Sequence, residues 1–162
     1  MLRKTKGSHS HLAGVISDTH GLVRLEALQA LQGVGLILHA GDVGNPEVLT
    51  ELRTIAPVYP VRGNMDREDW ARNLPKTATI DVGGFTLYVL HDINALDLDP
   101  AAAGFRAVIS GHSHQPSAVD RNGVLFLNPG SAGPRRFKLP VSLAILKIEG
   151  DLLGTRVVEL KV

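Results

Sequence analysis

Side chains that can bind metal ions recur directly after short apolar runs of this sequence. They supply oxygen or nitrogen donors, and in chain order they are Asp18, His20, Asp42, Asn64, His91, His112 and His114. In an extended segment, residues i and i+2 point to the same side, so each of the pairs 18/20 and 112/114 can offer two converging donors. Together these residues indicate a metal site.

Seven donors are too many for one tetrahedral ion, but they suit two ions that share a bridging carboxylate. Imidazole, carboxylate and amide donors without sulfur favour manganese, iron, zinc, cobalt or nickel over calcium. Two such ions about 4 Å apart can hold a hydroxide between them and clamp a phosphoryl group for in-line attack. With two carboxylates and one hydroxide, the inner shell keeps a charge of about +1, which suits an anionic substrate.

The apolar runs between these residues predict a β-α-β-α-β start followed by hairpins. The expected strands of the first half are 13–17, 36–38 and 58–61, with helices at 22–32 and 46–53. The expected strands of the second half are 77–82, 85–90, 107–110, 117–119, 124–127, 141–148 and 154–160, with hairpin turns at 83–84, 122–123 and 150–151. This order predicts an α/β sandwich in which two packed mixed β-sheets are flanked by helices.

The first expected helix carries leucines at a spacing of three, namely Leu22, Leu25, Leu28 and Leu31. We expect this face to pack into the core. The donors follow the strands, and parallel α/β proteins place ligands at the carboxyl ends of their strands. The metal site is therefore expected at that edge of the sandwich.

Length and composition fit a single domain. The 162 residues are 44% hydrophobic and 20% charged, and the net charge of +1 predicts no global attraction to nucleic acid or to an acidic membrane. Aromatic residues make up 4% of the chain, which argues against a stacking platform for single-stranded nucleic acid. The absence of cysteine excludes disulfides, thiolate zinc sites and a cysteine nucleophile.

The N-terminal residues lack the apolar stretch of a signal peptide. We expect residues 1–12 to form a flexible extension and residues 13–162 to form the domain. No apolar run of the sequence approaches the roughly 20 residues that span a membrane, so the protein is expected to be cytoplasmic.

Five short motifs resemble, in their order, those of the calcineurin-like metallophosphoesterases. They are D-x-H at 18–20, G-D at 41–42, G-N-x-D at 63–66, His91, and G-H-x-H at 111–114. The short length and the N-P-G-S motif at 128–131 resemble the small bacterial and archaeal phosphodiesterase branch of this superfamily. The resemblance runs from about Val15 to Arg136.

The resemblance implies a role for each donor. Asp18, His20 and His114 would bind the first metal ion, and Asn64, His91 and His112 the second. Asp42 would bridge the two ions, and a hydroxide held between them would be the nucleophile. Asn64 would also contact the substrate phosphate, and Asp66 would orient a nearby histidine or its own loop. The expected catalytic residues are thus Asn64, Asp66 and His91.

Two positions depart from the common pattern of the superfamily. Many members carry a histidine as the third residue of G-N-x-D, where this chain has Met65, which cannot protonate a leaving group. The small branch often lacks that histidine too. The histidine of the fourth motif is usually followed by glycine, whereas His91 is followed by Asp92. This carboxylate either orients His91 or points to solvent.

Each motif taken alone also has a structural explanation. Asp18, Asp42 and Asn64 are residue types that cap helices and form turns, and His91 is the least specific of the expected ligands. We interpret His39 as a supporting residue, because its offset from Asp42 does not match a ligand of the family.

The segment 128–136 leaves two interpretations open. It is either a plain loop, or Arg135 or Arg136 pairs with a second phosphate or with the far side of a diester. Asp97 and Asp99 are interpreted as a solvated face before Pro100.

The leading hypothesis is a metal-dependent phosphodiesterase that acts on a small or cyclic nucleotide-like substrate, with manganese first among the candidate metals. One alternative is a protein-interaction scaffold, because the superfamily includes a retromer subunit that works mainly by binding partners. Another is a phosphomonoesterase, which Met65 disfavours. The expected partner is a small phosphate ester, without membrane or nucleic acid. Pairing of exposed hairpin edges into a homo-oligomer stays open.

Overall fold

Ten strands and two short α-helices make up the part of the chain that the computed structural model describes, residues 10–162. In chain order the elements are β1 (Ser10–Ile16), α1 (Leu25–Ala30), β2 (Leu36–His39), α2 (Pro46–Leu52), β3 (Val58–Pro60), η2 (Asp69–Ala71), β4 (Thr77–Val82), β5 (Phe85–Leu90), η3 (Ile93–Ala95), β6 (Ala107–Ile109), β7 (Ser117–Arg121), β8 (Val124–Asn128), β9 (Ser142–Glu149) and β10 (Leu152–Glu159), where η denotes a 3-10 helix.

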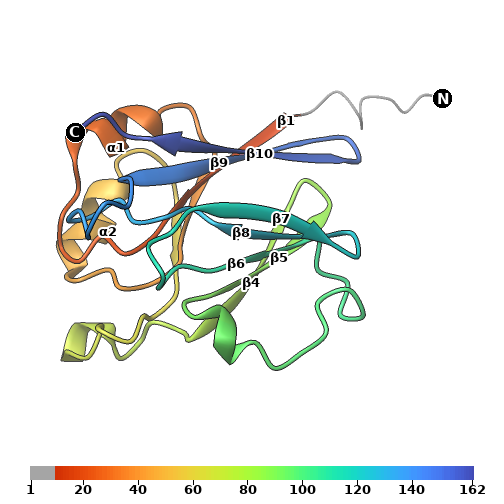
Figure 1. Cartoon of the computed structure of the whole chain (residues 1–162), viewed down its shortest axis with the longest axis horizontal. Coiled ribbons are helices and arrows are strands. Elements are labelled where there is room, and N and C mark those ends of the chain that lie inside the picture. The colour runs from red at the N-terminus through yellow and green to blue at the C-terminus, as the bar shows by residue number, and fades with distance from the viewer. Residues whose placement is uncertain (1–9) are drawn as a thin grey trace.

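The strands form two mixed sheets of five strands each. The first has the order β10-β9-β1-β2-β3, and the second has the order β4-β5-β6-β8-β7. β1, β2 and β3 are parallel, as expected of a β-α-β-α-β unit. The expected hairpin turns connect antiparallel pairs, β4 with β5, β7 with β8 and β9 with β10. The predicted sandwich of two mixed sheets is confirmed (Figure 1).

Three apolar clusters fill the spaces between and outside the sheets. The central cluster lies between the two sheets and includes Val15 and Leu38 of the first with Leu87 and Ile109 of the second. A second cluster packs α1 and α2 against the outer face of the first sheet. On the outer face of the second sheet, the third cluster is covered by the irregular segment after β5, including Phe105. In residues 10–162, the α-helices therefore flank one side only.

The expected leucine face of the first helix is partly wrong. Leu25 is 65% exposed, whereas Ala27 and Leu31 are fully buried. An α-helix turns once every 3.6 residues, so a spacing of three drifts around the helix, while the i, i+4 pair at 27 and 31 stays on one face. Helix α1 is also shorter than the expected 22–32.

The expected extension, residues 1–12, is wrong for its last three positions. Residues 10–12 belong to β1, where they pair with residues 147–149 of β9. Without residues 10–12, the backbone groups of β9 at 147–149 would lack a partner on this side. Pairing with β9 therefore extends β1 beyond the expected strand, which begins at Ala13. Residues 1–9 lie outside the described part of the chain. Within residues 10–162, no helix has both the length and the apolar character needed to cross a bilayer.

Candidate metal centre

Five strands end at one edge of the sandwich, and each is followed by expected donors. They are Asp18 and His20 after β1, Asp42 after β2, Asn64 after β3, His91 after β5, and His112 and His114 after β6. The structure brings these seven side chains together as an inner cluster of five and an adjoining pair, His112 with Asn64.

Two carboxylate oxygens lie among the imidazoles of the inner cluster. Asp18 Oδ1 is 3.3 Å from His114 Nε2 and 3.8 Å from His20 Nε2. Asp42 Oδ2 is 3.3 Å from His91 Nε2 and 3.8 Å from the same atom of His20. Within 4.8 Å of one another lie the donor atoms of two triads, Asp18/His20/His114 and Asp18/Asp42/His91.

The other oxygen of each carboxylate is fixed by the surrounding loops. Asp18 Oδ2 accepts hydrogen bonds from the Ser17 hydroxyl at 2.6 Å and from the backbone N–H of His112 at 3.0 Å. Asp42 Oδ1 accepts one from the backbone N–H of Met65 at 2.8 Å. Each carboxylate is therefore held by one oxygen and presents the other toward the imidazoles.

His91 is oriented by its second ring nitrogen. Its Nδ1 is 2.7 Å from the carbonyl oxygen of Ala40, which can only accept, so Nδ1 carries the proton. In the neutral ring, Nε2 then presents a lone pair toward the oxygens of Asp18 and Asp42. His91 Nε2 and Asp18 Oδ1 are buried without a hydrogen-bond partner in the described structure. Acceptors that face one another in a buried site require a cation, and mixed oxygen and nitrogen donors suit a divalent transition metal.

The shifted pKa values of three inner residues reflect both their burial and the close contact of carboxylates with imidazoles. Burial raises the pKa of Asp18, but the nearby imidazoles of His114 and His91 and the hydrogen bond from Ser17 together outweigh burial and hold that pKa below its ordinary value. Burial also raises the pKa of Asp42, but the His91 imidazole, the backbone N–H of Met65 and the charge of His20 together outweigh burial and lower that pKa. Burial lowers the pKa of His91, but the carboxylates of Asp42 and Asp18 and the carbonyl of Ala40 together outweigh burial and raise that pKa.

His112 and Asn64 form the more exposed part of the centre. His112 Nδ1 lies 3.1 Å from Asn64 Oδ1, and the rings of His112 and His91 meet edge to face with centroids 5.1 Å apart. The side chain of His112 is 44% exposed. Asp92 Oδ2 lies 3.9 Å from His112 Nε2, and its Oδ1 accepts from the backbone N–H of Asn94. Asp92 thus faces His112, a position that neither of its two expected roles described.

Asp66 holds the loops that carry two of the donors. Its buried carboxylate accepts hydrogen bonds from the backbone N–H groups of Val43, Gly44 and Gly63 at 2.9–3.1 Å. Of the two roles left open by the sequence, orienting the loop agrees with these contacts. The carboxylate fixes the turn after β2, and with it Asp42, against the turn after β3.

His39 supports the site from within the core. It is fully buried; its Nδ1 accepts from the backbone N–H of Gly41, and its Nε2 lies 3.0 Å from the Thr19 hydroxyl. Thr19 in turn donates to the carbonyl of Val43. Burial lowers the pKa of His39 to about 4. It is a neutral link between the loops after β1 and β2, as a supporting residue should be.

The N-P-G-S segment is part of the support too. Asn128 Nδ2 donates to the Gly111 carbonyl at 2.9 Å, and the Ser131 hydroxyl donates to the Asp18 carbonyl at 3.0 Å. These bonds join the end of β8 to the loops after β1 and β6. In the sequence, the N-P-G-S motif at 128–131 was the pattern that could have indicated this supporting role.

Two glycines let these loops touch. A Cβ at Gly63 would overlap the backbone nitrogen and Oδ1 of Asp42. A Cβ at Gly111 would overlap the Ser17 hydroxyl and lie 2.6 Å from Asp18 Oδ2. Any side chain at either position would displace a carboxylate donor.

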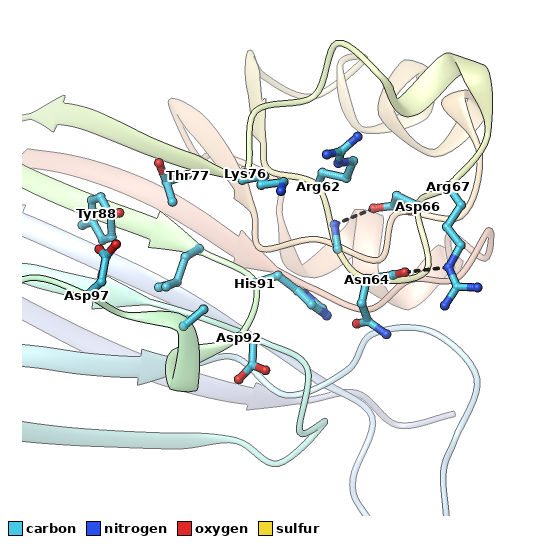
Figure 2. Close-up of a pocket in the computed structure, with 13 residues that line it drawn as sticks. Arg62, Asn64, Asp66, Arg67, Lys76, Thr77, Tyr88, His91, Asp92 and Asp97 are labelled. Atoms are coloured by element: carbon cyan, nitrogen blue, oxygen red, sulfur yellow. Dashed lines mark hydrogen bonds between the residues drawn. The ribbon is translucent and has the colours of Figure 1, made fainter.

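A cavity of about 750 Å³ opens beside Asn64 and His91 (Figure 2). The residues that line it are Arg62, Gly63, Asn64, Asp66, Arg67, Lys76, Thr77, Tyr88, Leu90, His91, Asp92, Ala95 and Asp97. Three cations and Tyr88 in this lining were not recognised from the sequence. Asp97, interpreted there as part of a solvated face, also lines the cavity.

Arg135 and Arg136 do not line this cavity. Both are exposed, and Arg135 Nη1 is within 3.4 Å of the Leu139 carbonyl in the same loop. Their expected contact with substrate stays a prediction.

Comparison with known sequences gives a family match over most of the chain. The sequence model of the calcineurin-like phosphoesterase superfamily domain matches residues 12–151. A protein of Methanothermobacter thermautotrophicus described as a "probable metallophosphoesterase" is 36% identical over 159 residues, which cover 91% of this chain and 91% of that protein.

Solved structures show the same fold at lower sequence identity. Vacuolar protein sorting 29 from Cryptosporidium parvum superposes with a TM-score of 0.80 at 22% identity, over 94% of this chain and 92% of that one. An archaeal phosphodiesterase superposes with a TM-score of 0.75 at 21% identity, over 91% and 99% of the two chains. At these identities the similarity establishes the fold alone.

Proposed function

The chain belongs to the calcineurin-like phosphoesterase superfamily, and from this premise we propose that it is a metal-dependent phosphodiesterase acting on a small or cyclic nucleotide-like substrate. The observation that carries the proposal is the set of buried acceptors that face one another without partners, Asp18 Oδ1 and His91 Nε2. They lie beside a cavity large enough for a nucleotide.

The proposed ligand sets follow the grouping of the side chains. Asp18, His20 and His114 would bind one ion, Asn64, His91 and His112 the other, and Asp42 both. When bound, two divalent ions, manganese first and iron, zinc, nickel or cobalt as alternatives, would supply an activated water and neutralise phosphate charge.

The protein's own groups would position the ester. Asn64 is exposed at the cavity, and its amide adds a hydrogen-bond donor without a negative charge that would repel phosphate. Asp66 and His39 would keep the loops of Asp42 and Asp18 in place through the bonds described above. Because these loops are fixed before substrate binds, little reorganisation is needed during the reaction.

Met65 favours a diester over a monoester. Its side chain is 55% exposed beside Asn64 and has no proton to donate. A diester carries one negative charge less than the corresponding monoester dianion and needs less neutralisation. We therefore expect diesters with good leaving groups to react best.

A scaffold function is the second candidate, because vacuolar protein sorting 29 shares the fold. All seven expected ligand positions are filled here, and the cavity beside them carries polar groups. These features favour hydrolysis.

The test is hydrolysis of bis-p-nitrophenyl phosphate beside p-nitrophenyl phosphate after chelation and refilling with manganese. Wild type should cleave the diester, and Asp42→Asn should lower kcat/KM by about 100-fold or more, because one ligand loses its charge. Asp151→Asn, in the exposed turn between β9 and β10, is the matched control and should keep full activity. If two manganese ions bind and neither ester is cleaved, the scaffold function is favoured instead.

A further inference from the structure

The cavity extends well beyond the metal centre, and its two sides differ in charge. On the side of the β3 and β4 segments lie Arg62 and Lys76; on the side of β5 and the segment after it lie Tyr88 and Asp97 (Figure 2). Asn64 and His91 occupy the end next to the metal centre. A phosphate bound at that end would leave most of the 750 Å³ for the rest of the substrate.

Arg62 and Lys76 are brought together by the backbone. The N–H of Arg62 donates to the carbonyl of Pro75 at 2.8 Å, which places the residue before Lys76 against Arg62. Among residues 10–162, the ion pairs of arginine and lysine are Arg72 with Asp69 and Lys147 with Glu149. Arg62 and Lys76 thus have no carboxylate partner in the described part of the chain.

A half-buried guanidinium without a counter-charge, such as that of Arg62, is costly. Lys76 is exposed and lines the same cavity, so both residues raise the local positive potential there. Arg67 differs, because its Nε donates to the Asn64 carbonyl at 3.1 Å and so belongs to the loop. Arg62 and Lys76 are free to bind an anion.

The opposite side suits an uncharged, ring-like group. Tyr88 is buried and stacked on Phe105, with ring centroids 4.9 Å apart and an interplanar angle of 24°. Ala95 adds exposed apolar surface, and the exposed carboxylate of Asp97 can accept hydrogen bonds from hydroxyl or amino groups. A sugar or a base meets these conditions better than a phosphate does.

We propose that the substrate is a nucleotide-sized phosphodiester carrying a second phosphate, which binds to Arg62 and Lys76 while the scissile phosphate lies at Asn64 and His91. This inference rests on the proposed function and narrows it. A guanidinium can bind phosphate through two parallel hydrogen bonds, and an ammonium adds a point charge. A simple diester would leave both cations unmatched.

Two chromogenic esters test the proposal on the manganese-loaded protein. One is the p-nitrophenyl ester of thymidine 5′-phosphate, and the other is the same ester with a 3′-phosphate. For wild type, the 3′-phosphate should raise kcat/KM by about tenfold or more, mainly through KM, because it gains charge-assisted hydrogen bonds. In the double variant Arg62→Met/Lys76→Met, the ratio of the two kcat/KM values should fall to about one.

The control and a second variant keep the result interpretable. Arg156→Met/Lys147→Met removes two exposed cations from the first sheet, outside the cavity lining, and should keep the wild-type ratio. If the Arg62→Met/Lys76→Met protein melts early, Lys76→Glu alone, at an exposed position, should lower the ratio by about tenfold. A wild-type ratio of one overturns the proposal.

Failure of the proposed function gives a different result. If wild type cleaves neither ester, calorimetry with thymidine 3′,5′-bisphosphate and thymidine 5′-monophosphate decides about the second phosphate on its own. Tighter binding of the bisphosphate by wild type, lost in Arg62→Met/Lys76→Met, supports the subsite. Equal binding of the two nucleotides by wild type overturns it.

Discussion

The two ends of the sandwich use the same left-handed backbone conformation with different residues. At the hairpin end, φ is positive at Gly83, Gly84, Asn122, Gly123 and Gly150. At the metal end, φ is positive at glycines such as Gly41 and Gly44, and it also lies between 46° and 70° at five donors that are not glycine, namely Asp18, His20, Asp42, His112 and His114 (Figure 1). Glycine adopts this conformation freely, whereas another residue loses about 1–2 kcal/mol.

This difference shows what each end contributes. The hairpin turns carry the residues that make a turn stable. The metal end keeps side chains that strain the backbone, because the same side chains supply the donors. Strain of this kind collects at functional sites and is balanced by packing elsewhere, here by the supporting bonds of His39, Asp66, Asn128 and Ser131.

The largest contrast should come from adding one methyl group at each end. Gly63→Ala should remove manganese binding and destabilise the protein by about 3 kcal/mol or more, because its Cβ overlaps Asp42. Gly84→Ala should cost only about 1 kcal/mol, since nothing lies within 4 Å of its Cβ and only its φ of 88° opposes alanine. Urea unfolding measures the stability of both variants, and calorimetry measures their manganese binding. Similar losses of stability and of manganese binding in Gly63→Ala and Gly84→Ala would contradict the placement of the metal site beside Gly63.

An effect of intermediate size is expected when His39 of β2 and His11 of β1 are compared for their contribution to the pH dependence of stability. His39, at the metal end of β2, has a pKa of about 4 in the folded chain against an ordinary 6.5. As pH falls from 7 to 5, the unfolded chain gains this proton and the folded chain does not, so the folded state should lose about 2 kcal/mol. His39→Gln should lose this part of the pH dependence when unfolding is followed in urea with chelator.

His11 provides the control for that experiment. It lies at the other end of the first sheet, in β1, and its side chain is exposed. The variant His11→Gln should retain the wild-type loss of stability between pH 7 and 5. The explanation fails if His39→Gln and wild type lose the same free energy of unfolding over this range.

The smallest expected contrast measures the strain itself. Without metal, His112→Gly should be more stable than His112→Ala by about 1 kcal/mol, because only alanine is strained at a φ of 70°. In the far turn, Asn122→Gly should differ from wild type by a few tenths of a kcal/mol, about the small preference of glycine over asparagine there. Both variants of His112 should lose activity. Equal stability of His112→Gly and His112→Ala would argue against strain at this residue.

The order of elements and the grouping of the donors could be predicted from the sequence. Short apolar runs that stop at polar residues mark strand ends, as at Asp18 and His91, and parallel strands bring such ends to one edge. The positions of two hairpin turns could also be predicted, because Gly83-Gly84 and Asn122-Gly123 are residue pairs that favour tight turns. Strand ends and tight turns depend on residues that are adjacent in the sequence, so a short sequence pattern is enough to predict them.

Features that depend on packing between distant segments could not be predicted. Residues 10–12 become a strand because β9 pairs with them. Arg62 and Lys76 line one cavity only because the chain at Pro75 returns to the segment after β3. Neither residue stands in a motif that would have marked it as part of a cavity.

The most direct test of the proposed two-metal centre is the number of manganese ions bound per chain at saturation, measured by equilibrium dialysis and elemental analysis. We expect two ions for wild type, at most one for Asp42→Asn, and two for the control Asp151→Asn. A wild-type chain that binds none, or an Asp42→Asn chain that binds two as tightly as wild type, would contradict this proposal.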